Sequence, residues 1–208
     1  MPRPALEIPA PVFIVLLAAG RSSRMQGGHK LLLPWGDGTV LRHVAQTAVA
    51  AAPTLVVLPP DAPALAAAVA GLDLRVVINA QPDRGMASSL VVALEALDDQ
   101  AGAVLIALAD MPAITRQDFA QVINAWPDAQ GRPIIRPHWH GQPGNPVLFD
   151  RSMFDQLRNV QGDQGARALI QADPTRLRLI AAASDAVLID IDTAEAYAAA
   201  RRRQDAIG

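Results

Sequence analysis

The sequence predicts an α/β fold in which helices flank a mostly parallel central sheet. Short apolar runs of strand length alternate with stretches of helical periodicity. The first run, VFIVLLA at residues 12–18, is apolar at consecutive positions, which is typical of a buried parallel strand. Hydrophobic residues make up 51% of the chain and aromatic residues only 4%, so the core must be built mainly from Val, Leu, Ile and Ala. The length of 208 residues fits one domain, spanning 1–208.

In the first half of the chain, strands and helices are expected to alternate. The expected strands are residues 12–18, 54–58, 75–79 and 103–108. The expected helices are residues 40–52, 62–70 and 86–97. Thr39 is placed to cap the first of these helices. A further helix begins after Thr115, which can cap it, and Asp118 favours its first turn.

After Trp126, frequent Pro and Gly residues predict loops and short elements. The expected strands are residues 134–136, 147–149, 176–180 and 186–189, with a short helix at residues 166–172. The stretch from Asp192 to Glu195 has the pattern of a capping box that opens the final helix, with Asp192 as the cap. No internal repeat or low-complexity linker interrupts this order.

Composition excludes several classes of protein. The formal net charge is −2, and the only basic run, Arg201–Arg203, fits the C-terminal end of a helix, so no nucleic-acid partner is expected. Because the chain has no cysteine, it has no disulfides, thiolate nucleophile or Cys-bound metal. No apolar run reaches the roughly 20 residues of a membrane span, and no positive segment precedes the first run, so a cytoplasmic protein without membrane association is expected.

The segment from Gly20 to Lys30 follows the first strand directly. Ligands of open α/β sheets gather at the carboxyl ends of strands, where glycine-rich backbone can approach phosphate oxygens. Arg21, Arg24 and Lys30 add positive charge there. A phosphate site and an ordinary solvated turn both fit this spacing. A Walker loop is excluded, because Lys30 is followed by Leu31 instead of Ser or Thr.

Three aspartates are candidates for binding a metal ion. Asp110 follows an apolar strand, and such a carboxylate can hold Mg²⁺ together with phosphate oxygens, although a plain turn role also fits. If parallel strands deliver their ends to one edge, Asp110 and the first loop converge. Asp190 and Asp192 lie in an extended segment and are expected not to face the same side; Asp192 is favoured as a helix cap, with metal binding as its second role. His138 and His140 fit a loop better than a zinc site.

Six blocks along the chain carry a family resemblance. They are, in chain order, LLAAGRSSRM…KLLLPWGDGTVL, NAQPDRGMASSL, LADMPAIT, GQPGNPVLF, GDQGAR and LIDIDTAEAY, and the match runs from about Val12 to Tyr197. Together they resemble the nucleotidyltransferases that modify molybdopterin, and most closely the cytidylyltransferases among them. The guanylyltransferase relatives usually show Leu-Ala-Gly-Gly at the first loop, where this chain has Ala19.

This resemblance implies a Rossmann-like nucleotidyltransferase fold with a nucleotide-binding part at about 12–115 and an acceptor-binding part at about 130–192. It implies transfer of CMP from CTP to molybdenum-bound molybdopterin, with Mg²⁺ as cofactor and release of pyrophosphate. The product would be the dinucleotide cofactor of a molybdenum hydroxylase, so that enzyme or its maturation chaperone is an implied partner. Transfer from GTP or ATP, a different phosphorylated acceptor, a non-catalytic carrier of the cofactor and a nucleotide-binding module are the alternatives.

The resemblance also implies roles for individual residues. Arg24, Lys30 and Asp110 would be catalytic, with Asp110 and secondarily Asp192 holding the metal ion. Nucleotide contacts are expected from Ala18, Ala19, Gly20, Arg24, Lys30, Ser88 and Ser89. Acceptor contacts are expected from Gly144, Asn145 and Arg167, and Asn145 stands where relatives often carry His. The stretch Gln26–Gly28 departs from the family pattern by lengthening the loop before Lys30.

Overall fold

The protein is described here by a computed structural model that covers residues 11–20, 29–97, 99–129, 131–162 and 165–207. The described strands form an eight-stranded sheet with the order β10-β7-β9-β6-β1-β4-β5, and β8 pairs with β7. The strands are β1 (Val12–Leu17), β4 (Thr54–Leu58), β5 (Arg75–Ile78), β6 (Ala103–Leu108), β7 (Ile134–Trp139), β8 (Gln142–Pro143), β9 (Val147–Asp150) and β10 (Leu177–Ala181). The strands β2 (Pro34–Trp35) and β3 (Gly38–Thr39) form a separate antiparallel pair.

The sheet is mostly parallel, as the sequence predicts. In the half that contains β6, β1, β4 and β5, every neighbouring pair is parallel. The strand β9 runs antiparallel to both β6 and β7, and β10 returns parallel to β7. Four parallel strands therefore deliver their carboxyl ends to one edge of the molecule.

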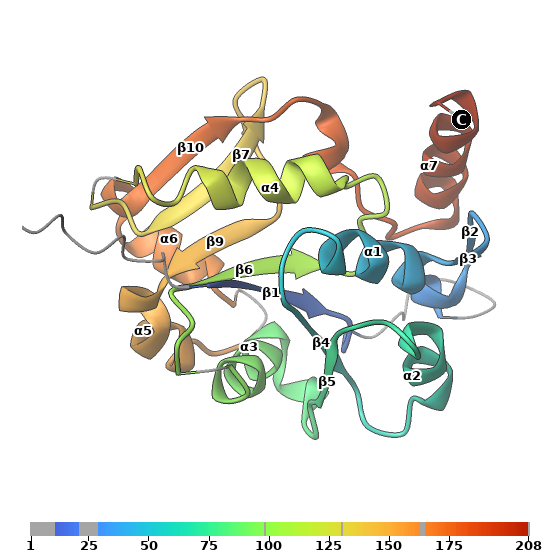
Figure 1. Cartoon of the computed structure of the whole chain (residues 1–208), viewed down its shortest axis with the longest axis horizontal. Helices are drawn as coiled ribbons and strands as arrows, with labels where there is room; N and C mark the ends of the chain where they lie inside the picture. The colour runs from blue at the N-terminus through green and yellow to red at the C-terminus, as the bar shows by residue number, and fades with distance from the viewer. Residues whose placement is uncertain (1–10, 21–28, 98, 130, 163–164, 208) are drawn as a thin grey trace, which may run out of the picture.

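Helices cover both faces of this sheet (Figure 1). They are α1 (Val40–Val49), α2 (Pro63–Val69), α3 (Met86–Glu95), α4 (Arg116–Asn124), α5 (Phe154–Arg158), α6 (Arg167–Ala172) and α7 (Ala194–Ile207). Figure 1 shows α1 and α4 on one side of the sheet and α3, α5 and α6 on the other. No helix in the described part of the chain combines the length and the apolar character that a membrane crossing needs.

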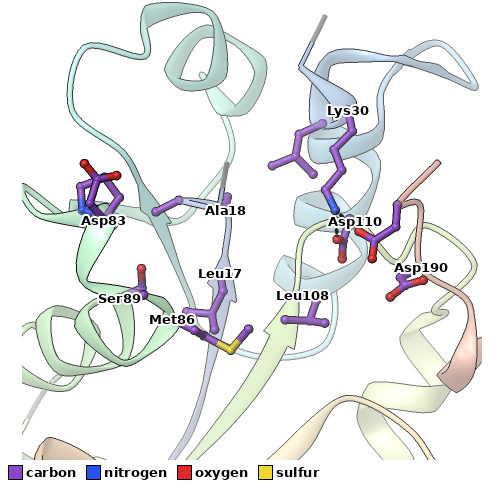
Figure 2. A pocket seen from close by; sticks show the side chains of 15 residues that line it. Leu17, Ala18, Lys30, Asp83, Met86, Ser89, Leu108, Asp110 and Asp190 are labelled. Carbon is purple, nitrogen blue, oxygen red and sulfur yellow. Dashed lines mark hydrogen bonds and ion pairs between the residues drawn. The ribbon is translucent and has the colours of Figure 1, made fainter. Parts of the chain in front are cut away.

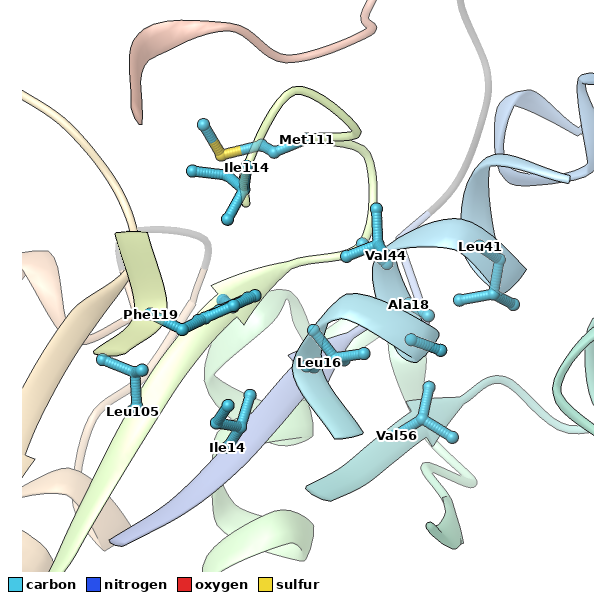
Figure 3. Close-up of a cluster of buried hydrophobic side chains, with 14 of the residues drawn as sticks. Ile14, Leu16, Ala18, Leu41, Val44, Val56, Leu105, Met111, Ile114 and Phe119 are labelled. Carbon is cyan, nitrogen blue, oxygen red and sulfur yellow. The ribbon is translucent and has the colours of Figure 1, made fainter. Parts of the chain in front are cut away.

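Two apolar cores lie on opposite faces of the sheet, and β1 contributes to both. Ile14 and Leu16 pack into the core under α1 and α4, where Phe119 is 1% exposed (Figure 3). Val15 faces the other core, which α3 and α5 complete. This alternation explains why the first strand is apolar at consecutive positions, since both of its faces are buried.

Two helix starts agree with the sequence in detail. The Thr39 hydroxyl accepts a hydrogen bond from the Arg42 amide of α1 at 3.2 Å. At α4, Thr115 and Asp118 form a reciprocal capping box. These caps satisfy amides that have no partner inside their helices.

Two local predictions are wrong. Residues 186–189 do not form a strand: Asp185–Leu188 is a 3₁₀ turn, because the Ser184 hydroxyl accepts from the Ala186 amide at 3.3 Å and closes it. The final helix is capped by Thr193 and not by Asp192, since the Thr193 hydroxyl accepts from the Ala196 amide at 3.1 Å. Asp192 is thereby left outside the helix, and its side chain is directed elsewhere.

Candidate active site

A cavity of about 800 Å³ opens where β1 and β6 end (Figure 2). Its lining comes from the ends of both strands, from the start of α3 and from the segment before α7. The side chains that the argument uses are Lys30, Ser89, Asp110, Asp190 and Asp192. The carboxyl edge of a parallel sheet is where ligands of such folds bind, so the cavity lies where the sequence predicts a site.

The end of β1 offers backbone to this cavity. The Ala18 amide donates to Val57 at 3.0 Å, and Leu17 accepts from the Ala109 amide at 3.2 Å, so the strand end is held from both sides. Ala18 and Ala19 are buried and Gly20 is exposed, and all three line the cavity. A Cβ added at Gly20 would meet no atom of the described residues within 4 Å, so these residues leave space beside it. A ligand can therefore approach this backbone closely.

Lys30 lies across the cavity from α3 and begins a 3₁₀ turn, Lys30–Leu32. Its ammonium donates hydrogen bonds to the carboxylates of Asp110 and Asp192, the latter at 2.7 Å. Burial alone lowers the pKa of Lys30, but the charges and hydrogen bonds of Asp110 and Asp192 outweigh it and leave the pKa raised. Lys30 therefore carries its positive charge throughout the neutral range.

Asp110 and the segment 190–192 are joined through the backbone. The Ile191 amide donates to the carbonyl of Asp110 at 2.9 Å, and Ile191 is 0% exposed in the core. Asp190 and Asp192 flank this anchored residue, and both line the cavity. The expectation that they face different sides is wrong, because residues two positions apart in an extended segment share a face.

The three carboxylates affect one another. The pKa of Asp190 is raised by partial burial and then by the negative charges of Asp192 and Asp110. Among the described residues, Lys30 is the cation that pairs with Asp110 and Asp192.

The fit of a divalent metal ion rests on Asp110. Its Oδ1 atom is buried and has no hydrogen-bond partner in the described part of the chain, which leaves an acceptor for a cation. No group of three or more His, Cys, Asp or Glu side chains among the described residues could hold a metal ion alone. Mg²⁺ commonly takes one or two carboxylates and completes its shell with water and phosphate oxygens. Asp110 and Asp192 fit that partial role.

Ser88 and Ser89 are both expected to contact the nucleotide, but their side chains line different cavities. Ser89 is 5% exposed and lines the cavity, whereas Ser88 lines a different hollow beyond α3. The Asn79 amide nitrogen donates to Ser88 Oγ at 2.8 Å and to Ser89 Oγ at 3.0 Å. Sequence reasoning missed Asn79, whose only local signal is an amide side chain at the end of a strand.

Arg24 and Arg21 lie outside the described residues. So do residues 26–28, the lengthened part of the loop. The expectation that Arg24 contacts phosphate therefore stays a prediction.

Of the three residues expected to contact the acceptor, two line a cavity and the third packs against a turn. Asn145 and Arg167 line a second cavity of about 370 Å³, which shares Met86 and Leu108 with the first. Gly144 instead packs against the turn before residues 190–192, where an added Cβ would lie 2.4 Å from the Val187 carbonyl oxygen. The Asn145 amide donates to that same oxygen at 2.8 Å. Gly144 therefore fixes the chain beside the site.

Residues 14–178 match the family described as MobA-like NTP transferase domain. The chain belongs to this family. Three curated relatives are similar to it over most of their length. They are nicotine blue oxidoreductase of Paenarthrobacter nicotinovorans (26% identical, covering 87% of this chain and 92% of the relative), molybdenum cofactor cytidylyltransferase of Escherichia coli strain K12 (26%, 91% and 95%) and a probable molybdenum cofactor guanylyltransferase of Rhodopirellula baltica (33%, 73% and 74%).

Solved structures support the same family fold. The crystal structure of Rv0371c from Mycobacterium tuberculosis H37Rv is 30% identical, with a TM-score of 0.82, and the match covers 91% of this chain and 96% of that one. A manganese complex of Rv0371c is 29% identical, with a TM-score of 0.78, and covers 91% and 97%. This chain is thus a nucleotidyltransferase of the MobA-like family with a Rossmann-like fold.

Proposed function

We propose that this protein transfers CMP from CTP to molybdenum-bound molybdopterin and releases pyrophosphate. The observation that carries the proposal is the convergence of Lys30, Asp110 and Asp192 beside the open backbone of Gly20. A cation, two carboxylates and accessible backbone amides are the groups that hold a metal-bound triphosphate. The cytidylyltransferase among the relatives supports the choice of substrates.

In the proposed reaction, a phosphate oxygen of the acceptor attacks the α-phosphorus of CTP. A new P–O bond forms, the bond between the α- and β-phosphates breaks, and pyrophosphate leaves with the electron pair. Lys30 neutralises charge on the triphosphate, and the backbone at Ala19 and Gly20 positions it. Positioning and electrostatic stabilisation supply most of the catalysis in such a transfer.

Asp110 and Asp192 would hold Mg²⁺, which when bound neutralises phosphate charge and orients the leaving group. The buried, unpartnered Asp110 Oδ1 supports this assignment. So does the manganese complex of Rv0371c, which is a structural relative of this chain. Asp110 and Asp192 would then contact both the metal ion and Lys30. The Lys30 ammonium would also interact with a phosphate oxygen of the nucleotide.

The preference for CTP rests on Ala19. Guanylyltransferase relatives usually carry Gly at this position, and the buried methyl group of Ala19 lines the cavity at the end of β1. The guanylyltransferase relative, 33% identical to this chain, favours GTP as the second candidate. The product would pass to a molybdenum hydroxylase or its maturation chaperone, and the reaction would take place in the cytoplasm, where nucleoside triphosphates are made.

The decisive experiment measures pyrophosphate release with CTP, GTP and ATP, each with and without molybdenum-bound molybdopterin and with and without Mg²⁺. We expect release only when CTP, acceptor and metal ion are all present. Equal or faster release with GTP would overturn the choice of nucleotide. Tight acceptor binding without any pyrophosphate would instead show a carrier.

A further inference from the structure

The second cavity contains an arginine that the proposed function does not use. Arg136 lies on β7 and lines this cavity together with Arg167, the first residue of α6. The two residues are 31 positions apart in the sequence, and neither forms an ion pair with any described residue. The described lining of this cavity includes no carboxylate, so both cations face it without an acidic partner from those residues.

Backbone contacts hold Arg136 in place. Its Nε donates to the Gly144 carbonyl at 2.7 Å, and its Nη2 contacts the Pro143 carbonyl at 3.5 Å. Both Nη1 hydrogens and one Nη2 hydrogen have no acceptor among the described residues, so a parallel pair of donors, one on each nitrogen, remains for a ligand. Partial burial lowers the pKa of Arg136, and the nearby charge of Arg167 lowers it further. Bringing in an anion would relieve this repulsion.

Arg167 follows a glycine that lies against α3. A Cβ at Gly165 would lie 3.4 Å from the sulfur of Met86 and 3.5 Å from Leu90, so the chain just before α6 lies directly on α3. The guanidinium of Arg167 makes no hydrogen bond to another described residue. Its donors are therefore also left for a ligand.

The rest of the cavity is apolar. Its walls include Met86, Leu90, Phe149 and Ile170, and Asn145 adds one amide. The cavity is contiguous with the nucleotide cavity along Met86 and Leu108, which line both. A ligand here would present an anionic group to the arginines and a ring or hydrocarbon part to the walls, next to the cavity that is proposed to hold the nucleotide.

We propose that Arg136 and Arg167 together bind the phosphate of the acceptor, and that Arg136 makes the site selective for phosphomonoesters. This inference rests on the proposed function. The planar guanidinium of Arg136, fixed at Nε, offers paired donors that match two phosphate oxygens. An acceptor with a neutral hydroxyl in place of phosphate would leave both arginines uncompensated and bind weakly.

The test uses phenyl phosphate as the probe and benzyl alcohol as its neutral counterpart, with binding to the full chain measured by calorimetry. The variants are Arg136→Gln and Arg167→Gln. Each should weaken phenyl phosphate binding by roughly ten- to hundredfold, as expected when a charged hydrogen bond is lost. Benzyl alcohol should bind weakly to the wild type and should not respond to either variant.

Arg178→Gln is the matched control. Arg178 is also a strand arginine that donates to backbone carbonyls, here Ala125 and Asp128, each at 2.8 Å, but it does not line the cavity. Its variant should bind phenyl phosphate like the wild type. If Arg178→Gln weakens binding as much as Arg136→Gln does, the effect is structural and the proposal is overturned.

Binding of CTP with Mn²⁺, measured on the same variants, separates this inference from the proposed function. We expect it to be unchanged in Arg136→Gln and Arg167→Gln, which also shows that both variants are folded. Unchanged phenyl phosphate binding in the folded variants would overturn the arginine site alone. If the wild type binds phenyl phosphate through the arginines but does not bind CTP, the proposed function fails and the anion site stands.

Discussion

The ammonium of Lys30 bonds to the carboxylate of Asp110, a residue 80 positions later in the chain (Figure 2). This ion pair joins the segment after β1 to the segment after β6, which are neighbouring parallel strands. Asp192 adds a third segment through its own bond to Lys30. Charge balance in the cavity therefore depends on three distant parts of the sequence.

Replacing Asp110 should remove metal-dependent activity. Asp110→Asn keeps the shape of the side chain but loses its charge, so we expect pyrophosphate release to fall on the order of a hundredfold or more. Binding of Mn²⁺ in the presence of nucleotide, followed by electron paramagnetic resonance, should weaken in parallel. Asp155→Asn is the control, because the Asp155 side chain is 93% exposed and its ion pair within the described part of the chain is with Arg158. Normal metal-dependent turnover in Asp110→Asn would remove Asp110 from the mechanism.

Replacing Lys30 should change two affinities in opposite directions. Lys30→Met leaves Asp110, Asp190 and Asp192 without their described cationic partner, so Mn²⁺ should bind more tightly to the nucleotide-free protein. The triphosphate loses a charged partner, and its affinity should fall roughly tenfold or more. Titrations of Mn²⁺ and of CTP, done separately, measure the two effects. A loss of both affinities would mean that Lys30 only supports the fold.

Ser88 and Ser89 allow a matched comparison of a serine in the nucleotide cavity with one outside it. Ser89 lines the nucleotide cavity and Ser88 does not, yet both accept a hydrogen bond from Asn79. We expect Ser89→Ala to raise KM for CTP and Ser88→Ala to leave it unchanged. Steady-state kinetics of the two variants checks this. Equal effects would indicate that both serines act through the position of α3.

Replacing Gly144 with alanine should disturb the active-site cavity, although Gly144 does not line that cavity. In Gly144→Ala the new Cβ would collide with the Val187 carbonyl and its side chain, and the turn that leads to Asp190 and Asp192 must shift. We expect the free energy of unfolding to fall by about 1–3 kcal/mol, measured by urea titration, together with a loss of turnover. Gly141→Asn is the control, since Gly141 has a φ of +84° but open space around it. Full activity in Gly144→Ala would show that this turn does not position the carboxylates.

Acidification should destabilise the fold through His43. Burial lowers the pKa of His43 below its usual value near 6.5, against a smaller opposing effect of the Pro112 carbonyl. The unfolded state therefore binds more protons as the pH falls through 6.5, and the free energy of unfolding decreases from neutral pH toward pH 5. Urea titrations across this range should show a shallower decrease in His43→Gln. An identical slope in the variant would assign the effect to other groups, such as His29, whose pKa is also lowered by burial and by Lys30.

The sequence predicts the strand–helix order and the convergence of Lys30 with Asp110 because both follow from local patterns. Strand ends are marked by apolar runs that stop, and parallel strands bring their ends together. The roles of these residues stay predictions. The cap at Thr193 and the turn at Ser184 could not be chosen from sequence, because Asp192 and a β-prone run at 186–189 offered equally good local alternatives.

Asn79, Arg136 and the packing role of Gly144 were missed for a different reason. Each of them acts on a residue that is distant in the sequence, and sequence periodicity does not identify that residue. Asn79 bonds to two serines on α3, Arg136 lies near an arginine on α6, and Gly144 packs against the turn at Val187. The error over Asp190 and Asp192 was one of geometry, since positions two apart in an extended segment share a face.

The hydrogen bond between Ile191 and Asp110 has a consequence for biosynthesis. Residues 190–192 follow every strand of the sheet in the chain, so the segments that carry Lys30 and Asp110 are synthesised before Asp190 and Asp192. The cavity is therefore completed by the segment that comes after the last strand of the sheet. A chain that ended just before residue 190 would keep every strand of the sheet but would lack both of these carboxylates.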